Sequence, residues 1–151
     1  MTESLRDQFP RSVVCQGAVR IAASADRVWA MVGDVGDATI ARSFIERIEM
    51  HGRGIGAVRD LHLGGGMVIS ERIEEYSDAD RYYVYRVVDQ GPTSFAHHLA
   101  MTQVVPAGPG QCIVSWITMA QPLNGCDAEV RAMLQGNIDA VLSLIKQHFE
   151  R

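Results

Sequence analysis

The sequence predicts an α+β domain of the helix-grip kind, in which a curved antiparallel sheet of seven strands wraps around one long C-terminal helix. Three observations predict this fold class. Segments of alternating apolar and polar residues, typical of half-buried strands, fill most of the chain between residues 44 and 120. Short, turn-rich segments separate them, and connections this short join antiparallel neighbours. Residues 127–151 carry apolar side chains at helical spacing and form the element large enough to cover the sheet.

The elements follow one another in a simple order. "SVVCQGAVRI" predicts a first strand at residues 12–21, and "SADRVWAMVGD" predicts a short helix that Ser24 caps, with Asp26 in its first turn. Gly33 and Gly36 end this helix, and "DATIAR" predicts a second short helix. The other six strands are expected at residues 44–50, 57–63, 67–75, 81–88, 95–105 and 112–120.

Length, charge and composition narrow the function classes. The 151 residues are expected to form one domain, with residues 1–11 as a flexible N-terminal segment. A net charge of -4 argues against a nucleic-acid or anionic-membrane partner, which would require a basic face. No segment is apolar enough to span a bilayer or to act as a signal peptide, so we expect a cytoplasmic protein without membrane insertion. The 3 cysteines are widely spaced, which predicts neither disulfides nor a zinc site, and no metal or cofactor is expected.

The stretch "VRDLHLGGGMVISER" places two charges within an apolar pattern. Side chains alternate across a strand, and the apolar residues on both sides of the glycines have odd numbers, with Arg59 and Glu71 among them. A hairpin centred on Gly65 keeps both apolar sets on one face and places Leu61 opposite Ile69. Arg59 and Glu71 then become direct cross-strand neighbours.

Two interpretations of this charged pair stay open. In the first, Arg59 and Glu71 form an ion pair that satisfies itself inside the protein and fixes the strand register, because a lone buried charge is very costly. In the second, both residues face a cavity and orient a polar group of a ligand, with Glu71 available as a general base.

Gly64, Gly65 and Gly66 are interpreted as a hairpin turn. Phosphate-binding loops open onto a helix N-terminus, whereas this triplet leads into a strand and has no Gly-Lys-Ser/Thr after it. Glycine supplies the positive φ angles that such a turn needs.

His97 and His98 are adjacent in one expected strand, so they point to opposite faces and cannot bind one metal ion together. The residue pattern alone leaves open which of them faces inward. The odd-numbered positions from Phe95 to Met101 are more apolar than the even-numbered positions from His98 to Val104. A buried histidine is more often neutral and hydrogen-bonded than catalytic.

Three stretches carry a resemblance to a known family. "SADRVWAMVGD", "GAVRDLHLGGGMVISERIEEYSDADRYYVYRVV" and "CIVSW" resemble the polyketide cyclase/dehydrase-type branch of the START/Bet v 1-like superfamily. The most specific part is the G-x-x-R…G-x-x-x-x-E-R string. The resemblance implies a fold with an internal cavity for a hydrophobic or amphipathic small molecule. It implies an activity only weakly, because members range from cyclases to ligand carriers and sensors.

The resemblance also indicates which residues line that cavity. In the family pattern the side chain at about position 98 faces inward, which favours His98, and the glycine turn lies at the cavity mouth, as a plain turn or as a mobile gate. Aromatic side chains on the inner face would suit a flat apolar ligand. With Glu71 and His98 as candidate catalytic residues, the expected ligand-binding residues are Arg59, Leu61, Ile69, Glu71, Tyr83, Tyr85, His98, Trp116 and Asn137.

An inward-facing His98 has a consequence for the outer face of the sheet. It turns a set of large apolar side chains outward: Leu99, Met101, Ile113, Ile117 and Met119. Monomeric proteins rarely expose a continuous apolar patch of that size. We therefore expect a homodimer, or another oligomer, through the outer face of residues 95–105 and 112–120.

Three functions are compatible with these observations. The first is binding of a hydrophobic or aromatic small molecule, with a polar group, in a cavity between the sheet and the C-terminal helix. The second is a cofactor-free enzyme for aldol cyclisation or dehydration of a polyketide-like substrate, in which Glu71 or His98 moves protons and Arg59 holds an enolate or carboxylate. The third is a protein-interaction module with a collapsed cavity. The sequence does not identify the ligand.

Overall fold

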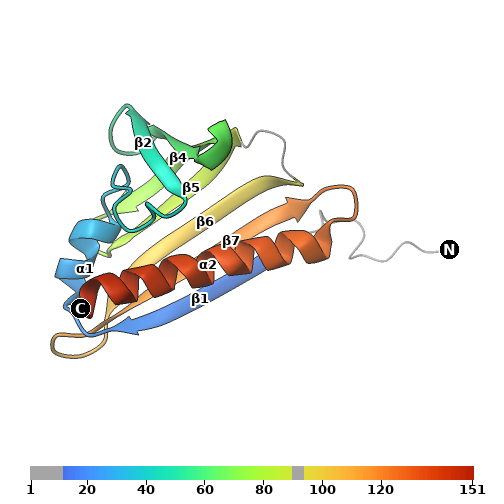
Figure 1. Cartoon of the computed structure of the whole chain (residues 1–151). Coiled ribbons are helices and arrows are strands. Elements are labelled where there is room, and N and C mark those ends of the chain that lie inside the picture. Colours follow the sequence, from blue (N-terminus) through green and yellow to red (C-terminus); the bar gives the residue numbers. More distant parts are fainter. Residues whose placement is uncertain (1–11, 90–93) are drawn as a thin grey trace.

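The computed structural model describes residues 12–89 and 94–151 and confirms the helix-grip fold (Figure 1). One antiparallel sheet has the strand order β1-β7-β6-β5-β4-β3-β2. Its strands are β1 (Val13–Ile21), β2 (Ile45–His51), β3 (Val58–Leu63), β4 (Val68–Ser77), β5 (Tyr82–Asp89), β6 (Phe95–Pro106) and β7 (Cys112–Pro122). The α-helices are α1 (Ala25–Val32) and α2 (Asp127–Phe149), and the short 3₁₀-helix η2 (Gly64–Gly66) joins β3 to β4. The expected flexible N-terminal segment, residues 1–11, lies outside the described residues.

None of the helices in the described ranges has the length and apolar character needed to cross a membrane.

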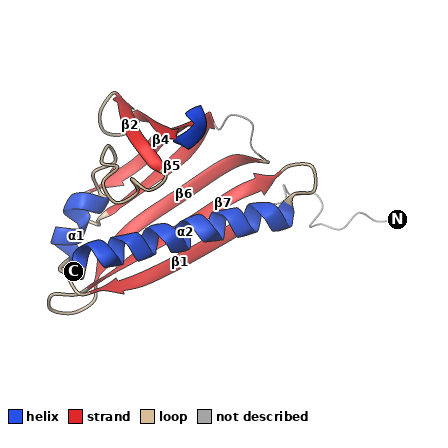
Figure 2. Cartoon of the chain, in the orientation of Figure 1, coloured by secondary structure: helices blue, strands red, loops and turns tan. Residues whose placement is uncertain are grey.

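One short α-helix, and not the two that we predicted, follows β1 (Figure 2). Helix α1 begins as expected, with the Ser24 hydroxyl accepting a hydrogen bond from the Arg27 backbone N–H at 3.2 Å. The "DATIAR" segment instead forms turns that lead into β2. The reason is local: the Asp37 carboxylate accepts a hydrogen bond from the Thr39 backbone N–H at 2.8 Å, and such a bond competes with helix formation.

Helix α2 lies along one side of the sheet. It packs mainly against β1 and, to a smaller extent, against β7 (Figure 1). Gln135 and Lys146 donate hydrogen bonds to the backbone oxygens of Gln16 and Arg20 in β1, at 3.1 Å and 2.9 Å. The buried side of the helix consists of Val130, Leu134, Ile138, Leu142, Ile145 and Phe149. Strands β2 to β5 form a lobe beside this helix, and Glu71, Ile73 and Tyr85 on its inner face are buried.

A glycine in β1 allows α2 to approach the sheet. A Cβ atom at Gly17 would lie 2.8 Å from Ile138 Cγ2 and 3.0 Å from Leu142 Cδ1. A glycine within α2 itself has a different environment, because a Cβ atom at Gly136 would meet nothing within 4 Å. The close contact between helix and sheet thus depends on Gly17 and not on Gly136.

We expect Gly17→Val to lower the free energy of unfolding by about 1–3 kcal/mol, because the added methyl groups have to displace Ile138 and Leu142. Gly136→Ala is the matched variant and should raise it by up to about 1 kcal/mol, since alanine favours a helix and has free space here. Urea unfolding followed by circular dichroism measures both. Equal stability of Gly17→Val and the wild type would contradict the close approach.

Candidate ligand-binding site

The glycine hairpin has the register that the sequence predicts. Arg59 pairs with Glu71 and Leu61 pairs with Ile69 across β3 and β4. Gly64–Gly66 form a tight turn in which Gly65 and Gly66 have φ angles of 79° and 81°. Residues other than glycine rarely adopt these angles, so the triplet acts as a turn, as expected.

Arg59 and Glu71 form a buried ion pair on the inner face of the sheet. Arg59 Nε donates to Glu71 Oε1 at 2.9 Å, and the two residues are only 8% and 5% exposed. Arg59 Nη1 donates to the backbone oxygen of Val35, in the loop after α1, at 3.0 Å. The guanidinium carbon lies 4.9 Å from the ring centre of Tyr85 and 5.4 Å from that of Tyr83. Groups of the protein therefore surround this pair.

The pair neutralises itself electrically. Burial raises the pKa of Glu71, and the neighbouring charge of Arg59 opposes this rise. Burial alone would lower the pKa of Arg59, but the negative charge of Glu71 keeps it above its ordinary value. Burial also raises the pKa of Tyr85 well above its usual range, so its hydroxyl stays protonated. Together, Arg59 and Glu71 leave no net charge on this part of the inner face.

A bulge in β6 settles which histidine faces inward. The strand register shifts between Ala96 and Leu99, and His97 has a φ angle of 54°. As a result His97 is exposed, while both Phe95 and His98 are buried. The family pattern gave the correct orientation of His98. Before the bulge an odd-numbered residue, Phe95, faces inward. After the bulge the even-numbered residues from His98 to Val104 face inward.

Polar atoms without a hydrogen-bond partner gather on the inner face of β6 and β7. Within residues 12–89 and 94–151 they include both ring nitrogens of His98, the indole nitrogen of Trp116 and the hydroxyl oxygen of Thr118. Leaving one such buried group unpaired costs about 1–3 kcal/mol. Thr118 was not among the residues expected in the site, since nothing in the sequence shows that its hydroxyl has no partner.

Burial also fixes the charge of His98. It lowers the pKa of this histidine to about 4, so the imidazole is neutral at pH 7. Its ring lies among aromatic side chains, 6.0 Å from the ring centre of Tyr85 and 5.6 Å from that of Phe95.

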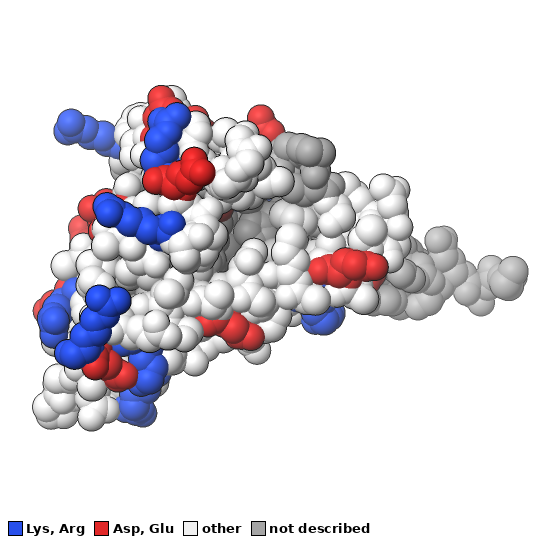
Figure 3. All heavy atoms as spheres, in the orientation of Figure 1, with Lys and Arg blue, Asp and Glu red and all other residues white. Residues whose placement is uncertain are grey.

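The remaining candidate residues lie nearer the surface. Leu61 and Ile69, on the inner face of β3 and β4, are half-buried, and Asn137 is exposed. At 100° per residue, Asn137 lies on the flank of α2 opposite Gln135, which contacts β1. We call the space between this flank and the inner face of β3 and β4 the recess. The surface is hollowed there, between α2 and the lobe (Figure 3).

A separate pocket of about 420 Å³ opens at the α1 end of the lobe. This volume lies within the range of small-molecule sites. None of the ligand-binding residues expected from the sequence lines this pocket, but Val35 does, and its backbone oxygen binds Arg59. The pocket is lined by Trp29, Ala30, Gly33, Asp34, Val35, Gly54, Ile73, Tyr76 and Asp78.

Comparison with known proteins identifies a family and a set of similar folds. The sequence model of the family described as "Polyketide cyclase / dehydrase and lipid transport" matches residues 12–150. No curated protein matches the chain. Among solved structures, XoxI from Bacillus cereus aligns with a TM-score of 0.81 at 23% identity, over 91% of this chain and 96% of XoxI.

Two further structures extend this comparison. A protein from Thermobifida fusca gives a TM-score of 0.79 at 26% identity, over 91% of this chain and 93% of that one. Norcoclaurine synthase from Thalictrum flavum, in complex with dopamine and hydroxybenzaldehyde, aligns with a TM-score of 0.74 at 18% identity. The alignment covers 97% of this chain and 92% of the synthase.

Breaking the buried ion pair should destabilise the protein. We expect Glu71→Gln to lower the free energy of unfolding by about 3 kcal/mol or more, because it leaves the Arg59 charge buried without its counterion. The double variant Arg59→Met/Glu71→Leu should lose less free energy of unfolding than Arg59→Met and Glu71→Leu lose together as single variants. Arg72→Met, which removes a more exposed ion pair with Glu74, is the control and should cost less than about 1 kcal/mol. Additive losses in this cycle would contradict the pairing.

His98 should make the stability depend on pH. Its pKa is about 4 in the folded protein and 6.5 when unperturbed, so between these values the unfolded chain binds more protons. The stabilisation is complete above pH 6.5 and is lost as pH falls toward 4, by up to about 3 kcal/mol. His98→Phe should remove this loss, whereas His97→Asn, at the exposed neighbour, should retain it. Identical pH profiles of His98→Phe and the wild type would refute the assignment.

Proposed function

The chain belongs to the polyketide cyclase / dehydrase and lipid transport family, and we propose that it binds a hydrophobic or aromatic small molecule between the sheet and α2. The observation that carries this proposal is a set of buried aromatic and polar side chains on the part of the inner face that lies beside α2. Helix α2 packs along β1 and β7, while Tyr83, Tyr85 and His98 occupy the inner face of β5 and β6. Protein sites for small molecules are mostly apolar, with a few placed polar groups. The complex of norcoclaurine synthase with two small aromatic molecules, in a similar fold, supports this choice of ligand class.

Each part of the inner face has a role in this proposal. The rings of Tyr83, Tyr85 and Trp116 stack against the flat ligand, and Leu61 and Ile69 form the apolar wall toward the recess. Asn137 contributes a polar group at the edge of α2. Arg59 and Glu71 support the site by fixing β3 against β4 and also contact the ligand on its polar side. The turn Gly64–Gly66 acts as the gate at the end of the hairpin.

An uncharged fluorescent probe tests the binding proposal. We expect the fluorescence of N-phenyl-1-naphthylamine to rise with the wild-type protein and to stay low with Ile69→Trp, because the larger ring fills the recess. Val68→Trp is the matched control, since Val68 is 37% exposed on the other face of β4. An unchanged probe signal with the wild-type protein, together with no small molecule retained in its native mass spectrum, would favour the interaction module with a collapsed cavity.

A cofactor-free acid/base enzyme is the second candidate function. It is favoured by His98, whose neutral ring has two nitrogens without a partner and is able to accept a proton from a bound substrate. Glu71 is the other candidate catalytic residue, with Arg59 holding the enolate. Once a substrate is found, His98→Ala and Glu71→Gln should reduce its turnover strongly. Unchanged turnover in both variants would exclude this chemistry.

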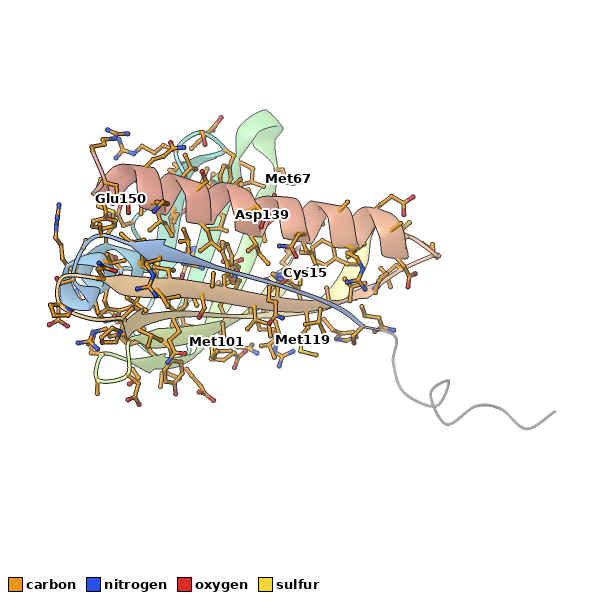
Figure 4. All side chains as sticks on the ribbon, turned by 90° about the horizontal axis from the view of Figure 1, so that it is seen from below. Cys15, Met67, Met101, Met119, Asp139 and Glu150 are labelled. Carbon is orange, nitrogen blue, oxygen red and sulfur yellow. The ribbon has the colours of Figure 1, made fainter. Side chains whose placement is uncertain are left out.

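We also propose a homodimer through the outer face of β6 and β7. The strand register places Val14, Met119 and Leu99 side by side, with Ile117 and Met101 in the next row. Met101 and Met119 point away from α2 (Figure 4). Val14, Ile117 and Met119 are 48%, 37% and 41% exposed, so the patch is continuous and accessible.

Ile117→Lys should convert the dimer to a monomer, because the charge would be buried in the contact. Ile55→Lys is the control, as Ile55 is 66% exposed in the turn before β3. Light scattering coupled to size-exclusion chromatography measures the mass. A monomeric wild-type protein at high concentration would refute the dimer.

The composition-based expectations of a cytoplasmic location, no nucleic-acid partner and no cofactor stay predictions.

A further inference from the structure

The outer face of β2 and β3 carries a group of metal-ligating side chains. Glu49 in β2 lies directly opposite Asp60 in β3, and His51 and His62 are the next outward positions on the two strands. Within the described residues, Glu49, His51 and Asp60 are the set whose ligand atoms all lie within 4.8 Å of one another. Arg59, the neighbour of Asp60, points to the inner face, so the sheet separates this group from the proposed ligand-binding site.

The two opposed carboxylates of this group favour a bound cation. Like charges directly opposite each other on neighbouring strands destabilise a sheet. Hydrogen bonds from Ser70 and His51 lower the pKa of Asp60, so its carboxylate is charged at pH 7. Arg47 lies 3.6 Å from the Glu49 carboxylate, but the two side chains are 64% and 49% exposed, and such surface pairs contribute little. A cation from solvent can reach both carboxylates.

A histidine nitrogen beside these carboxylates points to the same conclusion. Nε2 of His62 is shielded from water and has no hydrogen-bond partner within the described residues, although it lies 3.5 Å from Glu49 Oε2. Two ligand atoms of a tetrahedral zinc ion, each about 2.1 Å from the metal, lie about 3.4 Å apart. The separation of these two atoms therefore suits two ligands of one ion better than a direct hydrogen bond.

Asp60 is held in the way that ligating carboxylates are held. Its Oδ1 accepts a hydrogen bond from Ser70 Oγ at 2.6 Å, which leaves Oδ2 facing His51 Nε2 at 2.7 Å. Outer-shell hydrogen bonds of this kind orient metal ligands. To bind one ion, the contact between Asp60 and His51 has to open to about 3.4 Å. The His51 side chain is 53% exposed and is free to make this adjustment.

The donor atoms define the class of metal. Two imidazole nitrogens and two carboxylate oxygens suit Zn²⁺ and similar transition-metal ions, whereas Mg²⁺ and Ca²⁺ prefer oxygen ligands alone. We propose that the outer face binds one Zn²⁺ ion, or a similar divalent transition-metal ion, through four side chains: Glu49, His51, Asp60 and His62. The ion would neutralise the opposed carboxylates and fasten β2, at the edge of the sheet, to β3 (Figure 1).

This proposal departs from the sequence-based expectation of no metal. That expectation rested on the spacing of the cysteines. The four proposed ligands belong to two strands, and only the pairing of β2 with β3 brings them together.

Isothermal titration of the full chain, freed of metal by dialysis against EDTA, tests the proposal at pH 7.5. We expect Zn²⁺ to bind at one site per chain and Mg²⁺ at the same concentration to give no signal. Cys126→Ser, which removes a partly exposed thiol, should bind Zn²⁺ as the wild type does. Absence of Zn²⁺ binding, its loss in Cys126→Ser, or equal binding of Mg²⁺ would overturn the proposal.

Ligand variants locate the ion. His51→Ala and His62→Ala should each weaken Zn²⁺ binding by more than the roughly tenfold loss that removal of an outer-shell partner causes, and Ser70→Ala should cause about that tenfold loss. His97→Asn, at an exposed histidine of β6, is the control and should retain the wild-type affinity.

Urea unfolding gives a second measurement. Zn²⁺ should raise the midpoint of the wild type and not that of His51→Ala, because an ion that binds only the folded chain stabilises it. Wild-type affinity for Zn²⁺ in both His51→Ala and His62→Ala, or an equal Zn²⁺-induced rise of the midpoint in His51→Ala, would overturn the assignment.

Discussion

Two opposite charges buried side by side on β3 and β4 organise the lobe of this protein. Arg59 cannot lie inside the sheet without Glu71, and the turn centred on Gly65 is what brings the two opposite each other. The other hydrogen bond of Arg59, to the Val35 backbone oxygen, fastens the loop after α1 to the same face. This pair thus links β3 to β4, holds the loop after α1 and adds no net charge to the inner face.

This neutrality links the fold to the proposed function. Helix α2 packs along β1, where Gly17 allows its close approach. The inner face of the lobe carries mainly aromatic and polar side chains. The charges there are paired, whereas the hydrogen-bonding groups of His98, Trp116 and Thr118 are not. Such an interior supports the proposed binding of a hydrophobic or aromatic small molecule.

The features that follow from local rules were predictable from the sequence, and those that depend on irregular backbone were not. The pairing of Arg59 with Glu71 follows from residue parity and the glycine turn. The inward position of both Phe95 and His98 does not, because the bulge at His97 breaks the parity within one strand. The prediction of a second short helix was wrong because the Asp37 side chain stabilises a turn instead. The Val35 contact depends on a loop conformation that no periodic pattern describes.

The indole N–H signals of the 2 tryptophans offer the most direct test of ligand binding at the inner face. Trp29 Nε1 already donates to Asp78 Oδ1 at 2.8 Å and serves as an internal reference. Within the described ranges, Trp116 Nε1 lies beside the Tyr85 side chain without a well-aligned hydrogen bond. In a ¹H–¹⁵N correlation spectrum recorded during a titration with 2-naphthol, we expect the Trp116 signal to move downfield and that of Trp29 to stay in place. A saturating titration in which the Trp116 signal does not move would contradict the account.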